Sequence, residues 1–248
     1  MQPSELANWD PYRGSVAAAL ARAEIGECDL LPTGSNYVFL VTLRDREEGE
    51  GLAVYKPRRG EAPLWDFPDG TLYRRERAAY LVSVDLGWNF VPPTIIRDGP
   101  HGVGMVQLFI PNPPRDNFFT LRDDHADEMR RIALFDVVTN NADRKGGHCL
   151  LGADGRVWGI DHGLTFHESN KLRTVIWDYS EDAIPPSLME DLAGLAVRLN
   201  QSSAIRDGLR ALLDPSEVDA LRRRVETLLR ERVYPRPGYH RSVPWPPV

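Results

Sequence analysis

Two acidic residues and a histidine surround a short hairpin that the sequence predicts. Asp143 comes shortly before His148, and Asp161 lies just after the second strand. The strands 148–151 and 157–160 are joined by Gly-Ala-Asp-Gly, which is typical of a hairpin turn. Opposite residues of a hairpin lie roughly 5 Å apart, so we expect Asp161 to face His148, with Asp143 nearby. Such a group can hold a divalent cation and position a hydroxyl, which favours phosphoryl transfer over a loop of solvated polar residues.

Lysine is rare in this chain and occurs only at Lys56, Lys145 and Lys171. Every other position counted as Lys or Arg is arginine. A lysine in such a chain indicates either chance or a place that needs a compact ammonium group. We interpret Lys171, in a polar run, as chance. Lys56 ends the apolar run 51–57, which is predicted to be a strand, and is the stronger candidate for a functional ammonium.

The elements that must position these residues divide the chain into a strand-rich first half and a helix-rich second half. The sequence predicts strands at 36–43, 52–56, 93–97 and 103–109, and helices at 13–25, 71–86, 123–140, 187–199 and 215–232. This order indicates an α+β fold, in which a small antiparallel sheet with one helix precedes a helical lobe. We expect a first lobe at 1–112 and a second at 113–248, joined near the proline-rich segment 109–118, with a cleft between them.

Composition limits the classes of protein to consider. The 248 residues are 42% hydrophobic, which is enough to bury a core. The apolar runs stop well short of the roughly 20 residues of a membrane span, and the first residues do not resemble a secretory signal, so we expect no stable membrane insertion and a cytoplasmic location. A net charge of −6 without a basic run argues against nucleic-acid binding. Cys28 and Cys149 lie far apart, without the spacing of a disulfide framework or a zinc site.

Several segments resemble those of known kinases. Two segments, ALFDVVTNNADR (133–144) and GIDHGLTF (159–166), resemble the catalytic and metal-binding segments of phosphatidylinositol 3/4-kinase-like proteins, most closely those of the type II phosphatidylinositol 4-kinases. The upstream segments ERAAYL (76–81) and VPPT (91–94) are also similar to that group. The order of parts is more distantly similar to that of HipA-type and secretory-pathway kinases. Small, uncharacterised bacterial kinase-like proteins share the pattern as well. The resemblance covers about residues 25–170 and implies a two-lobed protein-kinase-like fold.

The resemblance also implies an ATP site on the first lobe. Lys56 would pair with the α- and β-phosphates, and Glu76 on the following helix would hold its ammonium by an ion pair. The chemistry agrees, because kinases position one point charge on a polyphosphate in this way. The phosphates would be covered by the backbone N–H groups of a turn formed by Gly34, Ser35 and Asn36. Adenine would bind to the backbone of a hinge formed by Gln107, Leu108 and Phe109. An apolar strand end of this kind is, however, more often plain core.

In the second lobe the resemblance implies the catalytic and metal-binding groups. Asp143 would orient or deprotonate the attacking hydroxyl, and Asp161 would bridge the β- and γ-phosphates through Mg²⁺. His148 departs from the kinase pattern, in which asparagine is the more common second metal ligand. Imidazole suits Mn²⁺ or a transition metal better than Mg²⁺, so the sequence leaves the choice between Mg²⁺ and Mn²⁺ open.

Two basic residues follow the proposed base. Arg144 and Lys145 could neutralise the transferred phosphoryl group or the substrate, and Arg144 could equally be a structural ion-pair partner of Asp136. Between the lysine strand and the Glu76 helix, the sequence around Trp65 forms an insertion. This insertion is a candidate lid or substrate contact, or a surface flap.

The predicted function is an ATP-dependent kinase that transfers the γ-phosphate to a hydroxyl of a protein Ser/Thr side chain or of a small molecule. One alternative is a pseudokinase-like nucleotide sensor, in which His148 has weakened metal binding. A phosphoinositide substrate is less expected, because the chain has no recognisable lipid-binding basic helix. The remaining alternative leaves Lys56 and Glu76 unexplained: it is a metal-dependent hydrolase that would use Asp143, His148, Asp161, His162 and His167.

Overall fold

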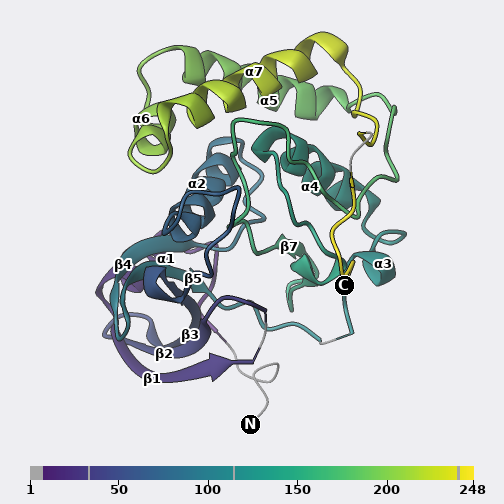
Figure 1. Ribbon diagram of the computed structural model, residues 1–248. Coiled ribbons are helices and arrows are strands. Elements are labelled where there is room, and N and C mark those ends of the chain that lie inside the picture. The colour runs from purple at the N-terminus through teal and green to yellow at the C-terminus, as the bar shows by residue number, and fades with distance from the viewer. Residues whose placement is uncertain (1–7, 33, 114, 239–240) are drawn as a thin grey trace.

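The computed structural model describes residues 8–32, 34–113, 115–238 and 241–248. It has two lobes, one built on a five-stranded sheet and one built mainly of helices (Figure 1). The α+β, two-lobed architecture that the sequence predicts is therefore confirmed. None of the helices in the described ranges is both long and apolar enough to cross a membrane.

The sheet is antiparallel throughout, in the order β1-β2-β3-β5-β4. Its strands are β1 (Glu24–Leu31), β2 (Val38–Asp45), β3 (Gly49–Pro57), β4 (Thr94–Gly99) and β5 (Gly102–Leu108). The last four match the predicted strands closely. The sequence did not predict β1, because this edge strand is largely exposed and its pairing is interrupted between Ile25 and Cys28, so it lacks a regular apolar alternation.

The two faces of the sheet have different partners. On one face, α1 (Val16–Arg22) packs through Leu20 in a cluster that includes Tyr55 of β3. Successive side chains of a strand point to opposite faces, so Lys56 lies on the other face. On that face lies α2 (Leu72–Asp85), which contacts β4 and β5. The strand period therefore turns the lysine toward the helix that carries Glu76.

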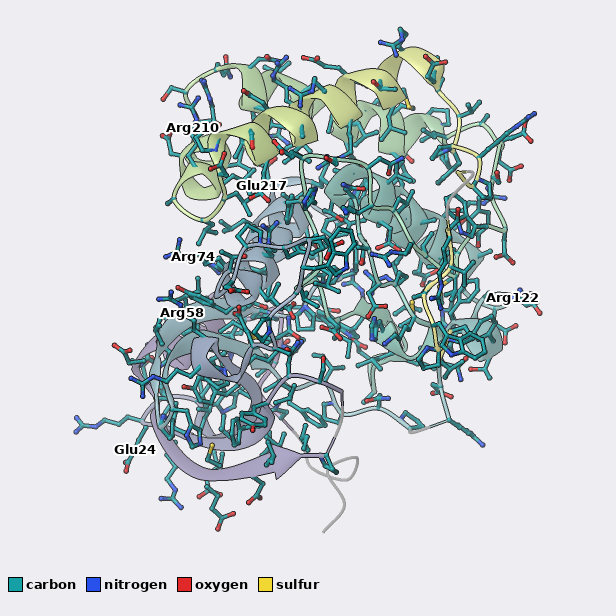
Figure 2. All side chains as sticks on the ribbon, viewed as in Figure 1. Glu24, Arg58, Arg74, Arg122, Arg210 and Glu217 are labelled. Carbon is teal, nitrogen blue, oxygen red and sulfur yellow. The ribbon has the colours of Figure 1, made fainter. Side chains whose placement is uncertain are left out.

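The second lobe is assembled around a central helix. Its core joins Ile132 and Phe135 of this helix, α4 (Ala126–Thr139), to residues of the terminal helices and to Val82 of α2. Glu217 lies where the terminal helices meet α2 (Figure 2), and there it pairs with the buried Arg75 at 2.7 Å. The helix α2 is thus fixed against the second lobe as well as the sheet. The elements of this lobe are α3 (Phe118–Leu121), α4 (Ala126–Thr139), β6 (Cys149–Leu151), β7 (Val157–Gly159), α5 (Pro186–Asn200), α6 (Ala204–Arg210) and α7 (Pro215–Glu231).

The predicted helices and the hairpin mostly agree with these bounds. The four helices predicted from residue 71 onward begin and end within a few residues of α2, α4, α5 and α7. The first predicted helix, 13–25, is too long, because its last residues belong to β1. The lobe boundary predicted at residue 112 falls between the end of β5 and the start of α3 and stays a prediction. Residues 1–7 of the predicted first lobe lie outside the described residues.

Candidate active site

Lys56 joins two carboxylates that come from different lobes. Its Nζ lies 2.6 Å from Oε1 of Glu76 on α2 and 2.9 Å from Oδ1 of Asp161, which follows β7. Oε2 of Glu76 accepts a hydrogen bond from the backbone N–H of His162 at 2.8 Å. Asp161 has a left-handed backbone, with φ of 60°. The structure therefore brings together three residues that the sequence places far apart.

The charges of this group support one another. Burial alone would lower the pKa of Lys56, but the carboxylates of Asp161 and Glu76 outweigh burial and raise the pKa above its ordinary value. Burial alone would raise the pKa of Asp161, but Lys56 and His148 outweigh it and hold the pKa far below the usual range. For Glu76, burial dominates and raises the pKa, and Lys56 offsets only part of this effect. At neutral pH the group therefore holds a firmly protonated ammonium beside an ionised Asp161.

The hairpin β6–β7 places His148 beside Asp161, as the sequence predicts. The distance from His148 Nε2 to Asp161 Oδ2 is 3.3 Å, and the backbone N–H of Ile160 donates to the His148 carbonyl. Burial lowers the pKa of His148 to about 4, so the ring is neutral at pH 7. Its Nδ1 accepts from the N–H of Lys145 at 3.3 Å, which leaves the proton on Nε2, facing Asp161.

The residues around Asp161 fit a divalent cation only in part. The side chain of Asp161 is 45% exposed, so its oxygens are accessible to a ligand. Within the described ranges, no group of three or more His, Cys, Asp or Glu residues could hold a metal ion. Mg²⁺ needs only one or two protein carboxylates when phosphates and water supply the other ligands, so Asp161 suffices as an anchor. His148 fits less well, because binding through Nε2 would move its proton to Nδ1, against the N–H of Lys145.

Asp143 is held in the loop that leads to the hairpin. Its backbone N–H donates to Oδ1 of Asn141, and its Oδ2 lies 3.3 Å from Nζ of Lys145. The side chain is 29% exposed, which leaves it accessible to an acceptor group. Burial raises the pKa of Asp143, and Lys145 partly opposes that effect. The structure thus provides a carboxylate with increased basicity beside an ammonium group.

Arg144 is buried in the core and is not accessible to an acceptor. It is completely buried, and its guanidinium pairs with Asp136 at 3.0 Å and donates to the Ile160 carbonyl. The hydroxyl of Thr174 and the side-chain amide of Asn141 also donate to Asp136. The geometry does not support the prediction that Arg144 neutralises a phosphoryl group. Asp136 on α4 is a buried carboxylate that needs a cation, and Arg144 supplies it, which was the alternative expected from the sequence.

The turn predicted to cover the phosphates connects β1 to β2. Gly34 has φ of 75°, a conformation that favours glycine, and the space around its Cα is open. Oδ1 of Asn36 accepts from the backbone N–H of Ala62 at 2.8 Å, which ties the turn to the insertion after β3. Ser35 lies between them in the same turn. The turn thus lies between β1 and β2, and its contact with phosphates stays a prediction.

The predicted hinge residues are occupied within the sheet. The side chain of Gln107 donates to Thr94, the N–H of Leu108 donates to the Pro93 carbonyl, and the N–H of Phe109 donates to the Leu52 carbonyl. Gln107 and Leu108 are also buried. These N–H groups are not free to bind adenine, so adenine would have to bind the segment through its carbonyl groups, and the hinge stays a prediction.

The insertion between β3 and α2 reaches the second lobe. Phe67 is buried in a cluster with Ala142, which directly precedes Asp143, and Asp66 pairs with Lys171 at 3.1 Å. Trp65 is 92% exposed, and Nζ of Lys171 lies 4.9 Å from its ring centroid. The interpretation of Lys171 as chance missed these contacts, although its rarity in the chain was a usable signal. A cavity of about 600 Å³ also borders the insertion, but its lining does not include the site residues; it is formed by Arg58, Arg59, Glu61, Ala62, Pro63, Asp69, Gly70, Asp98, Gly102 and Val103.

Sequence comparisons place the chain near proteins of two kinds. No protein-family model matches it. It is 44% identical to "Protein Rv2133c" of Mycobacterium tuberculosis, over 92% of this chain and 94% of that protein. It is 33% identical to phosphatidylinositol 4-kinase gamma 4 of rice over 56% of this chain, and 26% identical to phosphatidylinositol 4-kinase gamma 3 of Arabidopsis thaliana over 65%. The matches span only 26% and 34% of these plant proteins.

Several solved kinases have folds similar to this chain. The Golgi casein kinase has a TM-score of 0.56 at 15% identity, covering 88% of this chain and 74% of that one, and its Mn/ADP-bound form has a TM-score of 0.53. The Helicobacter pylori proinflammatory kinase CtkA has a TM-score of 0.54 at 10% identity, covering 87% of this chain and 94% of that one. The likeness confirms the two-lobed kinase-like fold. The kinase-like resemblance is thus supported, whereas membership of the phosphatidylinositol 3/4-kinase-like family itself is not confirmed.

Proposed function

We propose that this chain, which belongs to the same family as protein Rv2133c, is an ATP-dependent kinase that transfers the γ-phosphate to a hydroxyl group. A fold by itself does not establish an activity, because function depends on the site that the fold carries. The observation that carries the proposal is the convergence of Glu76 and Asp161 on the ammonium of Lys56. This arrangement supplies one fixed positive charge and one partly exposed carboxylate at the junction of the lobes, as polyphosphate binding requires.

The nucleotide would be held from both lobes. Lys56 would bind the α- and β-phosphates, oriented by Glu76, and the turn at Gly34 would cover them. Asp161, with His148 beside it, would hold Mg²⁺ or Mn²⁺, which when bound neutralises charge on the β- and γ-phosphates. The Mn/ADP-bound Golgi casein kinase structure supports nucleotide and divalent-metal use in this fold.

Asp143 would act on the acceptor. Its burial raises its pKa, which increases its ability to accept a proton from a hydroxyl, and its hydrogen bond from the N–H to Asn141 fixes the loop. Lys145, 3.3 Å away, would neutralise the transferred phosphoryl group. We propose a protein Ser/Thr side chain or a small-molecule alcohol as the acceptor.

A nucleotide sensor without turnover is the second candidate, and one observation favours it. The Nε2 proton of His148 faces Asp161, so the usual second metal ligand is replaced by a hydrogen-bond donor. Metal binding that depends on Asp161 alone would be weaker, and a weakly held metal lowers turnover more than nucleotide affinity.

Label transfer from γ-labelled ATP separates the two candidates. The full chain is incubated with Mg²⁺ or Mn²⁺, alone and with cell lysate, beside Asp143→Asn and the matched control Asp123→Asn, whose side chain is 94% exposed. We expect transfer by the wild type and the control, and a loss of about 10²-fold or more in Asp143→Asn with ATP affinity retained. Tight ATP binding without transfer would support the sensor, and absence of ATP binding would refute both candidates.

A further inference from the structure

The end of the chain runs along the second lobe to the catalytic loop. After α7, Tyr234 pairs through its backbone with Glu181 and Asp182. Further along, the Ser242 carbonyl accepts from the backbone N–H of Thr174. We call residues 241–248 the terminal segment. In Figure 1 it is drawn in yellow, passes α4 and finishes beside α3.

The terminal segment finishes with a hydrogen bond to the loop that carries the proposed base. The N–H of Gly146 donates to the carbonyl of Pro247 at 2.7 Å. Gly146 is buried and begins the short 3-10 helix η3 (Gly146–His148), which leads into β6. The Phe119 ring packs so closely against Gly146 that a Cβ there would lie 2.8 Å from it. The backbone of the loop therefore contacts both an aromatic ring and the terminal segment.

This contact is the main external support of the loop backbone. Arg144 is paired through its backbone with Arg173 and Val175, and the His148 carbonyl accepts from Ile160. Between these two points, the backbone of residues 145–147 makes a single hydrogen bond to a segment outside the loop within the described part of the chain, and Pro247 is its acceptor. A buried N–H without a partner is costly, so removal of this carbonyl should release the loop.

The terminal segment also contacts residues 174–177. In this stretch, the backbone N–H of Val175 donates to the carbonyl of Arg144 in the loop. The Ser242 carbonyl accepts from the N–H of Thr174 and from Nε1 of Trp177, both at 3.0 Å. Pro244 is buried, whereas Trp245 is 77% exposed. The contacts of the terminal segment with the second lobe therefore depend on backbone carbonyls and on Pro244. The large side chain of Trp245 contributes little to them.

We propose that the terminal segment is a positioning part of the active site, which fixes Asp143 and Lys145 through the backbone of Gly146. The proposal rests on the proposed kinase function. Phosphoryl transfer depends on accurate placement of the base, so a loop that moves by about 1 Å can lose about 10²-fold in rate while nucleotide binding persists. Nucleotide binding depends on Lys56 and Glu76, which the terminal segment does not contact in any described interaction.

The first test measures the loop itself and needs no activity. A variant that ends at Pro244 keeps the Ser242 contacts and removes Pro247, and the matched control is the full chain with Trp245→Ala and Val248→Ala, two exposed side chains. Amide hydrogen exchange is followed at Gly146 and, for reference, along α4. We expect exchange at Gly146 to be about tenfold faster in the shortened variant, as for the loss of one hydrogen bond, with α4 and the control unchanged.

The second test measures turnover. We expect kcat of the shortened variant to fall by about tenfold or more while KM for ATP stays within about twofold, because binding and positioning are separated. If the shortened variant does not fold, Pro246→Gly with Pro247→Gly in the full chain loosens the same contact and should give smaller changes in the same direction. The proposal would be overturned if Gly146 in the shortened variant exchanges at the wild-type rate, or if it exchanges faster while kcat is unchanged. A wild type that transfers no phosphate would instead refute the kinase function, and the exchange result would still decide whether the segment holds the loop.

Discussion

Removal of the Lys56 ammonium should destabilise the protein by an amount that depends on Glu76. The side chains are 20% and 1% exposed, and 2.6 Å separates their charged atoms. Breaking a buried ion pair by removing one partner costs about 3–5 kcal/mol. The N–H of His162 still donates to Glu76, and water reaches part of the Lys56 site, so we expect Lys56→Met to cost about 3 kcal/mol, the lower end of that range. Asp161 adds little to this cost, because its side chain is 45% exposed and can be hydrated.

The double variant separates the pair from the general effect of substitution. Glu76→Gln also breaks the pair, but Lys56→Met together with Glu76→Gln leaves no unpaired buried charge between them. We therefore expect the double variant to cost about 2 kcal/mol less than the sum of the single variants. Urea unfolding, followed by the fluorescence of the six tryptophans, measures all three. Costs that simply add would refute the coupling between Lys56 and Glu76.

The pH dependence gives a second check on the same reasoning. Burial raises the pKa of Glu76 even with Lys56 present, and loss of the ammonium should raise it further. In Lys56→Met, the folded protein then binds more protons than the unfolded protein between the ordinary and the raised pKa. Its stability should therefore fall as pH rises through this window and recover as pH falls. A cost of Lys56→Met that does not change with pH would contradict a charged, buried Glu76.

Three further outcomes follow from the site. His148→Asn replaces a hydrogen-bond donor by an oxygen ligand and should move the metal preference from Mn²⁺ toward Mg²⁺, measured as the ratio of turnover with the two ions; an unchanged ratio would remove His148 from the metal site. Lys145→Met removes the group that opposes the raised pKa of Asp143, so the acidic limb of the kcat–pH profile should move to higher pH, and a limb that stays in place would argue against Asp143 as the base. Arg144→Met leaves the fully buried Asp136 without its cation and should cost about 3–5 kcal/mol of stability in urea unfolding, whereas a cost below about 1 kcal/mol would contradict a structural role.

Local patterns allowed the hairpin and its neighbours to be predicted from the sequence. A turn of Gly-Ala-Asp-Gly between two short apolar strands sets which residues face each other, so the meeting of His148 and Asp161 could be predicted. This relation depends on spacing along the chain, which the sequence contains. The ion pair between Lys56 and Glu76 was implied by the resemblance to kinases, and the structure shows it at 2.6 Å.

Contacts between distant segments could not be predicted in this way. The direction of Arg144 depends on which carboxylate is buried nearby, and Asp136 became a partner only once α4 was placed in the core. The backbone groups of Leu108 and Phe109 are used by strands whose register the sequence does not specify. The bond between Gly146 and Pro247 joins two backbones, so no side-chain type marks it. In each case the sequence lacked the tertiary neighbour rather than the residue.

The contacts of Asp66 and Phe67 also limit how far the lobes can separate. Opening would expose a phenylalanine ring, which costs about 1.5–3 kcal/mol, and break the ion pair between Asp66 and Lys171. This cost adds to that of the contacts that already join α2 to the second lobe, among them the buried pair of Arg75 with Glu217. In the proposed kinase, the insertion would therefore restrict nucleotide exchange, and weakening the Phe67 contact should speed release of the spent nucleotide.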